Sequence, residues 1–303
     1  MNGGDRAVTV TIPATDGVPL AGCEYRPGPD VRYDLLVLPG IGVPQRLFRH
    51  LGAWFAERQV RVVTVDYRGV GASRLAAALR TTARLSTWAS RDAVGALRFV
   101  EETGNGAPVV LLGHSFGGQA IGFSAEFRRV AAAILVGAQF GQARHWDGLG
   151  RVKVAAYWNL ILPAATALFE VVPSWTGLGT PLPRGAAEEW ARWGRTRDWL
   201  LPHVPGAEAL YAGFDRPLRA YATLDDPIAP PRAVAELLRY FRATSVERVD
   251  LAPSDLGLER LGHFGLFRPG VERLWHEFLE YGSRHAEGTP GRGSRGGTPA
   301  VPG

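Results

Sequence analysis

The chain has 303 residues, of which 46% are hydrophobic and 21% are charged, so it has enough apolar material for a large core and is not a disordered protein. Its single cysteine, Cys23, excludes an internal disulfide and a multi-cysteine zinc site, and a cytoplasmic location is expected. The formal net charge of +5 comes from scattered arginines rather than a dense basic run, so no nucleic-acid partner is expected.

The two ends of the chain carry different signals. The first ten residues show no basic stretch followed by an apolar run, so no signal peptide is expected. Residues 282–303 are rich in Gly, Pro, Ser and Arg and contain almost no large apolar side chain. Such a composition cannot offset the entropy cost of ordering, which predicts a disordered tail.

Strand and helix patterns alternate from the beginning of the chain. Alternating apolar runs at residues 7–13 and 19–26, separated by a turn cluster, predict a hairpin. The continuous apolar run at 33–38 is typical of a strand buried on both faces of a parallel sheet. Helical spacing of apolar residues between 44 and 59, followed by a strand at 60–67, completes one βαβ unit.

The alternation continues on both sides of a long interruption. The elements predicted before it are a helix through residues 88–100, a strand at 109–112, a helix after Gly117 and a strand at 131–136. Those predicted after it are a strand at 218–224, a helix at 231–241, a strand at 246–251 and a helix at 271–281. This order predicts an α/β fold with a mostly parallel, doubly wound sheet.

The interruption, residues 140–214, is predicted to be a helical cap without a convincing strand, inserted into a core formed by residues 1–139 and 215–281. It contains six of the nine tryptophans of the chain: Trp146, Trp158, Trp175, Trp190, Trp193 and Trp199. These side chains could roof a substrate pocket or pack the cap onto the sheet, and both interpretations stay open.

One stretch of the cap is nearly apolar. Residues 154–169 contain few polar side chains, but the run is only 16 residues long and has Pro163 in its middle. A membrane span needs about 20 residues. A cap helix is therefore expected in place of a membrane span.

The strongest local signal is GHSFG at residues 113–117, which directly follows an apolar strand and precedes a helical stretch. Glycines two positions before and after Ser115 let the chain turn sharply from strand to helix, which would present the serine hydroxyl above the sheet. The context predicts that Ser115 is a nucleophile. An incidental glycine-rich turn is the alternative.

A serine hydroxyl needs a base, which is usually a histidine held by a carboxylate. His263 lies in a glycine-flanked loop, LGHFG, between the last strand and the last helix, where it can reach the carboxyl edge of the sheet. The other six histidines lie in predicted helices, the cap, the tail or the elbow, and structural roles are expected for them: His50, His114, His145, His203, His276 and His285.

Two candidates for the acid follow the strand at 218–224. Asp225 and Asp226 lie between that strand and a helix that begins near Pro231. One of them is expected to orient His263. The alternative is a solvated pair that caps the helix.

The candidates occur in the order serine, aspartate, histidine, which is the order of the α/β-hydrolase fold. The chain resembles this family from about residue 7 to residue 281. The segments that carry the resemblance are LPGIG at 38–42, DYRGVGAS at 66–73, the elbow, DDPIAP at 225–230 and GHFG at 262–265. In its finer pattern the chain resembles a bacterial branch of predicted serine hydrolases.

The resemblance implies a complete set of site residues. The acid of this family commonly stands four residues before the proline of a DxxxP segment, which selects Asp226, before Pro230, over Asp225. The family also implies an oxyanion hole made by the backbone N–H groups of Phe116 and Ile41. No metal and no cofactor are expected, and neither GxGxxG nor a Walker motif follows the first strands.

The expected reaction is hydrolysis of an ester or thioester of a small apolar acyl or aromatic compound through an acyl-enzyme on Ser115. An acyltransferase, a cofactor-free carbon–carbon bond hydrolase on the same residues, and a non-catalytic binding protein of the same fold stay open as alternatives. A small-molecule substrate is the expected partner, and the sequence does not decide the oligomeric state.

Overall fold

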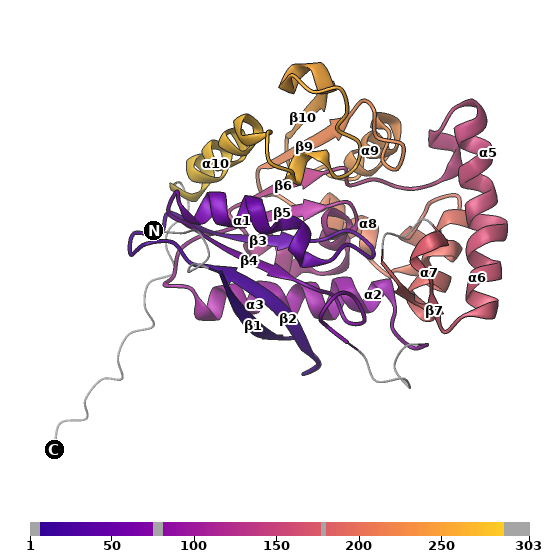
Figure 1. The fold of residues 1–303 in the computed structure, drawn as a ribbon, viewed down its shortest axis with the longest axis horizontal. Coiled ribbons are helices and arrows are strands. Elements are labelled where there is room, and N and C mark those ends of the chain that lie inside the picture. Colours follow the sequence, from indigo (N-terminus) through magenta and orange to yellow (C-terminus); the bar gives the residue numbers. More distant parts are fainter. Residues whose placement is uncertain (1–6, 75–80, 177–179, 288–303) are drawn as a thin grey trace.

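A computed structural model describes residues 7–74, 81–176 and 180–287. Within these residues the main sheet holds eight strands in the order β1-β2-β4-β3-β5-β6-β9-β10 (Figure 1). β2 is antiparallel to β1 and β4, and the other pairs are parallel. The strands are β1 (Ala7–Pro13), β2 (Pro19–Tyr25), β3 (Tyr33–Leu38), β4 (Val60–Val65), β5 (Val109–His114), β6 (Ala132–Val136), β9 (Leu218–Thr223) and β10 (Val246–Leu251). The predicted α/β fold with a mostly parallel sheet is confirmed.

The place of each strand in the sheet explains its residue pattern. Every residue of the central strands β3, β4 and β5 is buried. Helices cover both faces of these strands, so both faces must be apolar and the sequence reads as a continuous apolar run. The edge strand β1 alternates between exposed and more buried positions, and half of β10 is exposed.

Helices pack on both faces of the sheet. Leu51 and Phe278 belong to one core cluster, so helices α1 and α10 cover one face. Leu97 and Leu237 belong to the other cluster, so α3 and α9 cover the opposite face. The elements outside the region between β6 and β9 are η1 (Gln45–Phe48), α1 (Arg49–Ala56), α2 (Leu85–Thr87), η3 (Trp88–Ala93), α3 (Val94–Thr103), α4 (Phe116–Gln119), η4 (Ala120–Phe123), η5 (Ala125–Arg129), α9 (Pro231–Leu238), η10 (Pro253–Leu256), η11 (Gly265–Phe267) and α10 (Glu272–Glu287).

The segment between β6 and β9 is mainly helical and lies at one end of the sheet (Figure 1). Its elements are η6 (Ala143–His145), α5 (Gly148–Ala156), η7 (Tyr157–Ile161), α6 (Leu162–Leu168), β7 (Val171–Val172), η8 (Ser174–Thr176), β8 (Leu182–Pro183), α7 (Arg184–Arg195), η9 (Leu201–His203) and α8 (Ala207–Ala212). The pair β7 and β8 is antiparallel. The expectation of a segment without strands was wrong here, because two-residue strands are too short to leave a periodic signal.

The apolar stretch around Pro163 forms η7 and α6. η7 is a π-helical turn that ends two residues before the proline, and it contains the carbonyl with which the proline ring would clash in a regular α-helix. Among the described residues, no helix combines the length and the apolarity needed to cross a membrane.

The last helix continues beyond its predicted end. α10 extends to Glu287, and both Gly282 and Ala286 are buried. A Cβ atom at Gly282 would lie 2.6 Å from the ring of Tyr33, so the glycine lets the helix approach β3. The boundary predicted for a disordered tail, residue 282, is therefore too early. Residues 288–303 of that tail lie outside the described residues.

Candidate active site

Ser115 lies on a sharp turn between β5, which ends at His114, and α4, which begins at Phe116. Its backbone has φ +52° and ψ −116°, which is a strained conformation for a residue with a Cβ atom. The turn brings neighbouring chain segments very close. A Cβ atom at Gly113 would lie 2.6 Å from Gly118, and one at Gly117 would collide with the Leu38 carbonyl oxygen.

The predicted oxyanion loop passes directly over this turn. A Cβ atom at Gly40 would lie 3.1 Å from Cβ of Ser115, so Ile41 follows a residue that touches the elbow. Phe116 is the first residue of α4, and the first N–H groups of a helix have no partner within it. The structure therefore brings the nucleophile candidate and both predicted oxyanion-hole residues into one region.

The acid and base candidates are in direct contact. Nδ1 of His263 lies 2.7 Å from Oδ2 of Asp226, and both residues are buried. The other carboxylate oxygen, Oδ1, accepts hydrogen bonds from the N–H groups of Ile228 at 2.7 Å and Ala229 at 2.9 Å. These bonds fix the orientation of the carboxylate and thereby that of the imidazole.

Asp225 has a different role from its neighbour. Its carboxylate accepts hydrogen bonds from the backbone N–H groups of Leu261 and Gly262, each at 2.9 Å. It therefore holds the backbone of the loop that carries His263. The two aspartates act on the same loop, one through the histidine side chain and one through the main chain.

The base also lies beside the elbow. A Cβ atom at Gly137, directly after β6, would lie 3.1 Å from Cε1 of His263 and 3.6 Å from Oδ2 of Asp226. The residue before Gly137 is Val136, and its carbonyl accepts a hydrogen bond from the Ser115 N–H at 2.8 Å. Because the carboxyl ends of parallel strands share one edge, Ser115 after β5, Asp226 after β9 and His263 after β10 come to the same edge of the sheet.

Comparison with known proteins identifies the family of the chain. The profile of the alpha/beta hydrolase family matches residues 35–272, which is more than half of the chain. The chain belongs to the alpha/beta hydrolase family. Comparison of this hydrolase with curated proteins finds no match.

Solved structures of low sequence identity share the fold of the hydrolase. The esterase domain of a Rhodothermus marinus protein has a TM-score of 0.59 and 18% identity, over 92% of this chain and 99% of that one. A thermophilic esterase from Thermogutta terrifontis, bound to malate, has a TM-score of 0.59 and 16% identity, also over 92% of this chain and 99% of that one. Est1E from Butyrivibrio proteoclasticus, bound to ferulic acid, has a TM-score of 0.61 and 14% identity, over 92% of this chain and 99% of that one.

His114 takes part in the site of the hydrolase, although sequence reasoning assigned it only a structural role. Its Nε2 lies 3.1 Å from the carbonyl oxygen of His263, and its ring centroid is 4.7 Å from that of His263. Burial lowers the pKa of His114 well below its usual range, and the neighbouring His263 acts in the same direction. His114 is therefore neutral and donates Nε2–H to the loop of the base.

Asp66, directly after β4, is a second residue whose role sequence reasoning missed. Oδ1 accepts from the N–H of Gln45 at 2.6 Å, and Oδ2 accepts from the N–H of Ala72 at 2.9 Å. The carboxylate thus fixes the beginning of η1, the short helix that follows the oxyanion loop. The sequence offered no signal for this contact beyond the DYRGVGAS segment.

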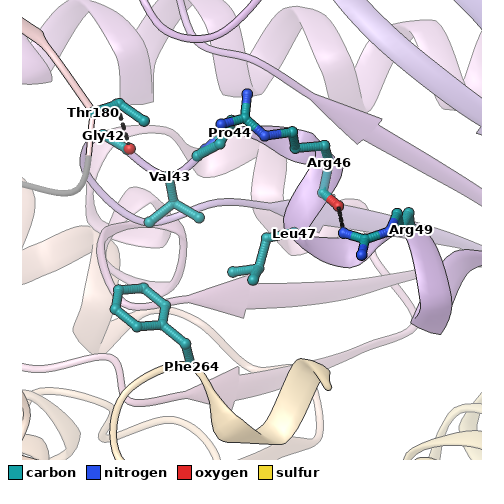
Figure 2. Close-up of a pocket in the computed structure, with 8 residues that line it drawn as sticks. All are labelled: Gly42, Val43, Pro44, Arg46, Leu47, Arg49, Thr180 and Phe264. Carbon is teal, nitrogen blue, oxygen red and sulfur yellow. Dashed lines mark hydrogen bonds between the residues drawn. The ribbon is translucent and has the colours of Figure 1, made fainter. Parts of the chain in front are cut away.

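A cavity of about 270 Å³ opens beside the oxyanion loop (Figure 2). Its lining residues are Gly42, Val43, Pro44, Arg46, Leu47, Arg49, Thr180 and Phe264. Sequence reasoning named none of them as substrate-binding residues. Among the described residues, no group of three His, Cys, Asp or Glu side chains is placed to hold a metal ion.

Proposed function

We propose that this hydrolase cleaves ester or thioester bonds of small apolar acyl or aromatic compounds through an acyl-enzyme on Ser115. The observation that carries the proposal is the 2.7 Å bond between Nδ1 of His263 and Asp226, formed at the sheet edge where Ser115 lies on its strained turn. A nucleophile, a base and an acid in this arrangement are the requirements of acyl transfer by serine.

The proposed reaction has two halves. Nε2 of His263 takes the proton of Ser115 while the serine Oγ attacks the carbonyl carbon, and Asp226 stabilises the imidazolium. The backbone N–H groups of Phe116 and Ile41 donate to the carbonyl oxygen as it gains negative charge. The intermediate then expels the alcohol or thiol, which takes the proton from His263.

The second half regenerates the enzyme. Water loses a proton to Nε2 of His263 and attacks the acyl carbon, and the C–O bond to Ser115 breaks as the histidine returns the proton to Oγ. The products are a carboxylic acid and the alcohol or thiol. Ester cleavage is also supported by the esterases among the proteins of similar fold.

The segment 140–214 is proposed to act as the cap of the site, on a core of residues 1–139 and 215–281. In support, the ring of Trp193 in α7 stacks on the ring of Phe116, the residue directly after Ser115, with 6.4 Å between the ring centroids. A cytoplasmic location is also proposed, on the sequence features given above.

Labelling with a fluorophosphonate probe tests the serine without knowledge of the substrate. We expect wild-type protein to be labelled and to hydrolyse 4-nitrophenyl butyrate. Ser115→Ala should abolish labelling and lower turnover by at least about 10⁴-fold, with an unchanged circular dichroism spectrum.

Ser254→Ala is the matched control, because Ser254 is exposed on η10 and should be replaceable without loss. Labelling or turnover that persists in a folded Ser115→Ala protein would overturn the proposal.

A further inference from the structure

The cavity beside the oxyanion loop has an apolar side and a basic side. Val43 and Leu47 point toward Phe264, whereas Arg46 and Arg49 lie on the opposite side (Figure 2). Its volume of about 270 Å³ is slightly below that of sites for drug-sized ligands, so it suits one arm of a small compound.

The cavity begins within a few residues of the reacting groups. Val43 Cγ2 would lie 3.3 Å from a Cβ atom at Gly40, which would also lie near Ser115 and His114, and the Val43 N–H donates to the Gly40 carbonyl at 3.2 Å. On the other side, Phe264 directly follows His263, and their ring centroids are 5.1 Å apart. The loop that contains Ile41 and the loop that contains His263 therefore each contribute a residue to the cavity lining, Val43 and Phe264.

The charge of the lining is entirely positive. The lining contains Arg46 and Arg49 and no acidic residue. Of the carboxylates in the described residues, none lies within ion-pair distance of either guanidinium. The charge of Arg46 opposes the rise in pKa that burial causes at Asp66, and both oxygens of that carboxylate already accept hydrogen bonds from backbone N–H groups.

Hydrogen bonds anchor the backbone that carries the two arginines. They lie in and directly after η1, whose first N–H is bound by Asp66, and Nη1 of Arg49 donates to the carbonyl of Arg46 at 3.3 Å. At the other end of the loop, the Thr180 hydroxyl donates to the carbonyl of Gly42 at 2.5 Å. Planar guanidinium groups bind carboxylates through paired hydrogen bonds.

We infer that this cavity binds a carboxylate at the end of a short apolar arm of the substrate, with the arm on Val43, Leu47 and Phe264 and the carboxylate on Arg46 and Arg49. The inference rests on the proposed function and narrows its substrates to esters with a carboxylate on one arm. Salt should weaken the attraction, so KM for such esters rises with ionic strength.

Two matched pairs of esters test the inference, one for each side of the scissile bond. The 4-nitrophenyl monoester of glutaric acid is compared with 4-nitrophenyl pentanoate, and 4-carboxyphenyl butyrate with phenyl butyrate. In one pair, kcat/KM should favour the anionic ester. The variant Arg46→Gln/Arg49→Gln should lower that preference by about tenfold or more.

Arg32→Gln is the control, because Arg32 is also exposed but precedes β3 at the opposite end of that strand from Gly40. It should leave all four rates unchanged. An anionic preference that is absent from both pairs, or that the double variant keeps in full, would overturn the inference.

Binding of monomethyl glutarate, measured by isothermal titration calorimetry, separates the inference from the proposed function. We expect binding to wild-type protein that the double variant weakens and Arg32→Gln does not. If this binding is found and no ester is hydrolysed, the proposed function fails and the inference stands. If esters are hydrolysed without anionic preference and the monoester does not bind, the inference fails alone.

Discussion

The adjacent aspartates Asp225 and Asp226 bind different partners and therefore have different roles. The two residues lie in a turn after β9, in which the Asp226 N–H donates to the Thr223 carbonyl at 3.2 Å. One carboxylate meets the imidazole of His263, and the other meets the backbone of Leu261 and Gly262. Each carboxylate has two accepting oxygens, and both residues use both of them.

The exchange of either carboxylate for an amide tests this division. Asp226→Asn keeps the shape but removes the charge that stabilises the imidazolium, so kcat/KM should fall by about 10⁴-fold. Asp225→Asn keeps one acceptor for the loop and should cost about tenfold or less in kcat/KM. Measuring both variants at one pH decides the matter, and a severe loss confined to Asp225→Asn would reverse the two roles.

His114 should make the stability of the protein depend on pH. Its pKa is far below 6.5 in the folded state, so below that pH the unfolded chain takes up a proton that the folded chain refuses. The stabilisation is present above about pH 6.5 and decreases as the pH falls, by on the order of 1 kcal/mol between pH 7.5 and pH 5.5. His114→Gln replaces the ring with an amide that does not titrate.

Urea denaturation of wild type and His114→Gln at both pH values measures this effect. The free energy of unfolding of wild type should fall by on the order of 1 kcal/mol more than that of the variant on going from pH 7.5 to pH 5.5. Equal changes in the two proteins would show that His114 titrates normally when folded.

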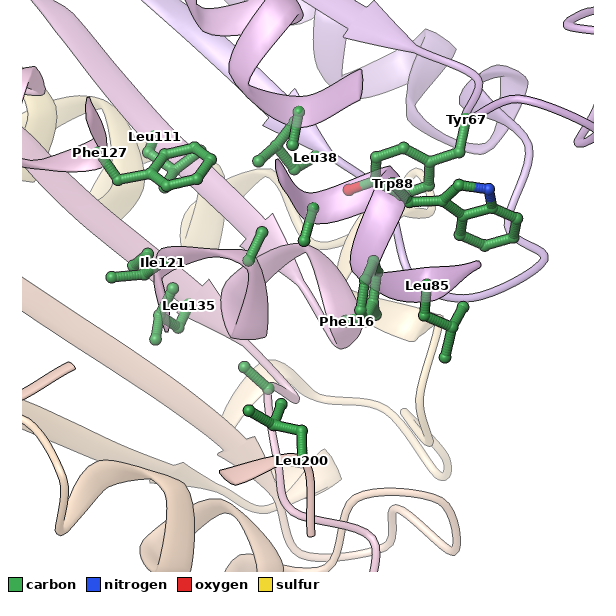
Figure 3. Close-up of a cluster of buried hydrophobic side chains, with 14 of the residues drawn as sticks. Leu38, Tyr67, Leu85, Trp88, Leu111, Phe116, Ile121, Phe127, Leu135 and Leu200 are labelled. Atoms are coloured by element: carbon green, nitrogen blue, oxygen red, sulfur yellow. The ribbon is translucent and has the colours of Figure 1, made fainter. Parts of the chain in front are cut away.

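At the scale of elements, the tryptophans of the segment 140–214 divide into packing and exposed residues. Trp193 and Trp199 are fully buried, and Nε1–H of Trp199 donates to the side chain of Gln119 in α4 at 3.0 Å. Phe116 belongs to the same core cluster, which also contains Leu38 and Leu200 (Figure 3). Of the two interpretations that the sequence left open, these contacts favour packing.

Replacement of single tryptophans should reproduce this division. Trp193→Ala removes a fully buried side chain that stacks on Phe116, so it should cost about 3–5 kcal/mol of stability. Trp175→Ala is the control, because 73% of that side chain is exposed and its loss should cost less than about 0.5 kcal/mol. Similar losses in both variants, measured by urea denaturation, would contradict the assignment.

At the scale of the whole molecule, the site is assembled from segments that lie far apart in sequence. The nucleophile follows β5, and the acid and base follow β9 and β10, on the far side of the long helical segment. This separation is possible because β9 pairs with β6 in parallel, so the sheet continues as though the segment were absent. The two parts of the chain meet at one sheet edge.

α10 fastens the end of the chain to the sheet, and truncations should reveal it. Ending the chain after Tyr281 removes the last turns of α10, including the buried Gly282 and Ala286, and should cost about 1–3 kcal/mol and lower Tm by several degrees. Ending it after Glu287 should leave Tm unchanged, given the composition of residues 288–303. A Tm that is equal in the two truncations would contradict the role of residues 282–287.

Much of the fold could be predicted because its signals are local. The strands at 33–38 and 246–251 have the predicted bounds, and burial of the strand at 33–38 on both faces leaves an apolar run within six residues. The ends of helices were harder to predict. α10 passes through Gly282 because that glycine packs on Tyr33, a residue about 250 positions earlier, and no local pattern records such a contact.

The sequence by itself determined the α/β alternation and the strand–turn–helix around Ser115, because periodicity and the glycines of a tight turn act over a few residues. Tertiary structure alone decided that Asp225 holds the backbone of the His263 loop, that His114 donates to the His263 carbonyl, and that Arg46, Arg49 and Phe264 line one cavity. These contacts depend on the paths of loops whose residues are far apart in sequence. The direction of each side chain is fixed only when the whole sheet brings those loops to one edge.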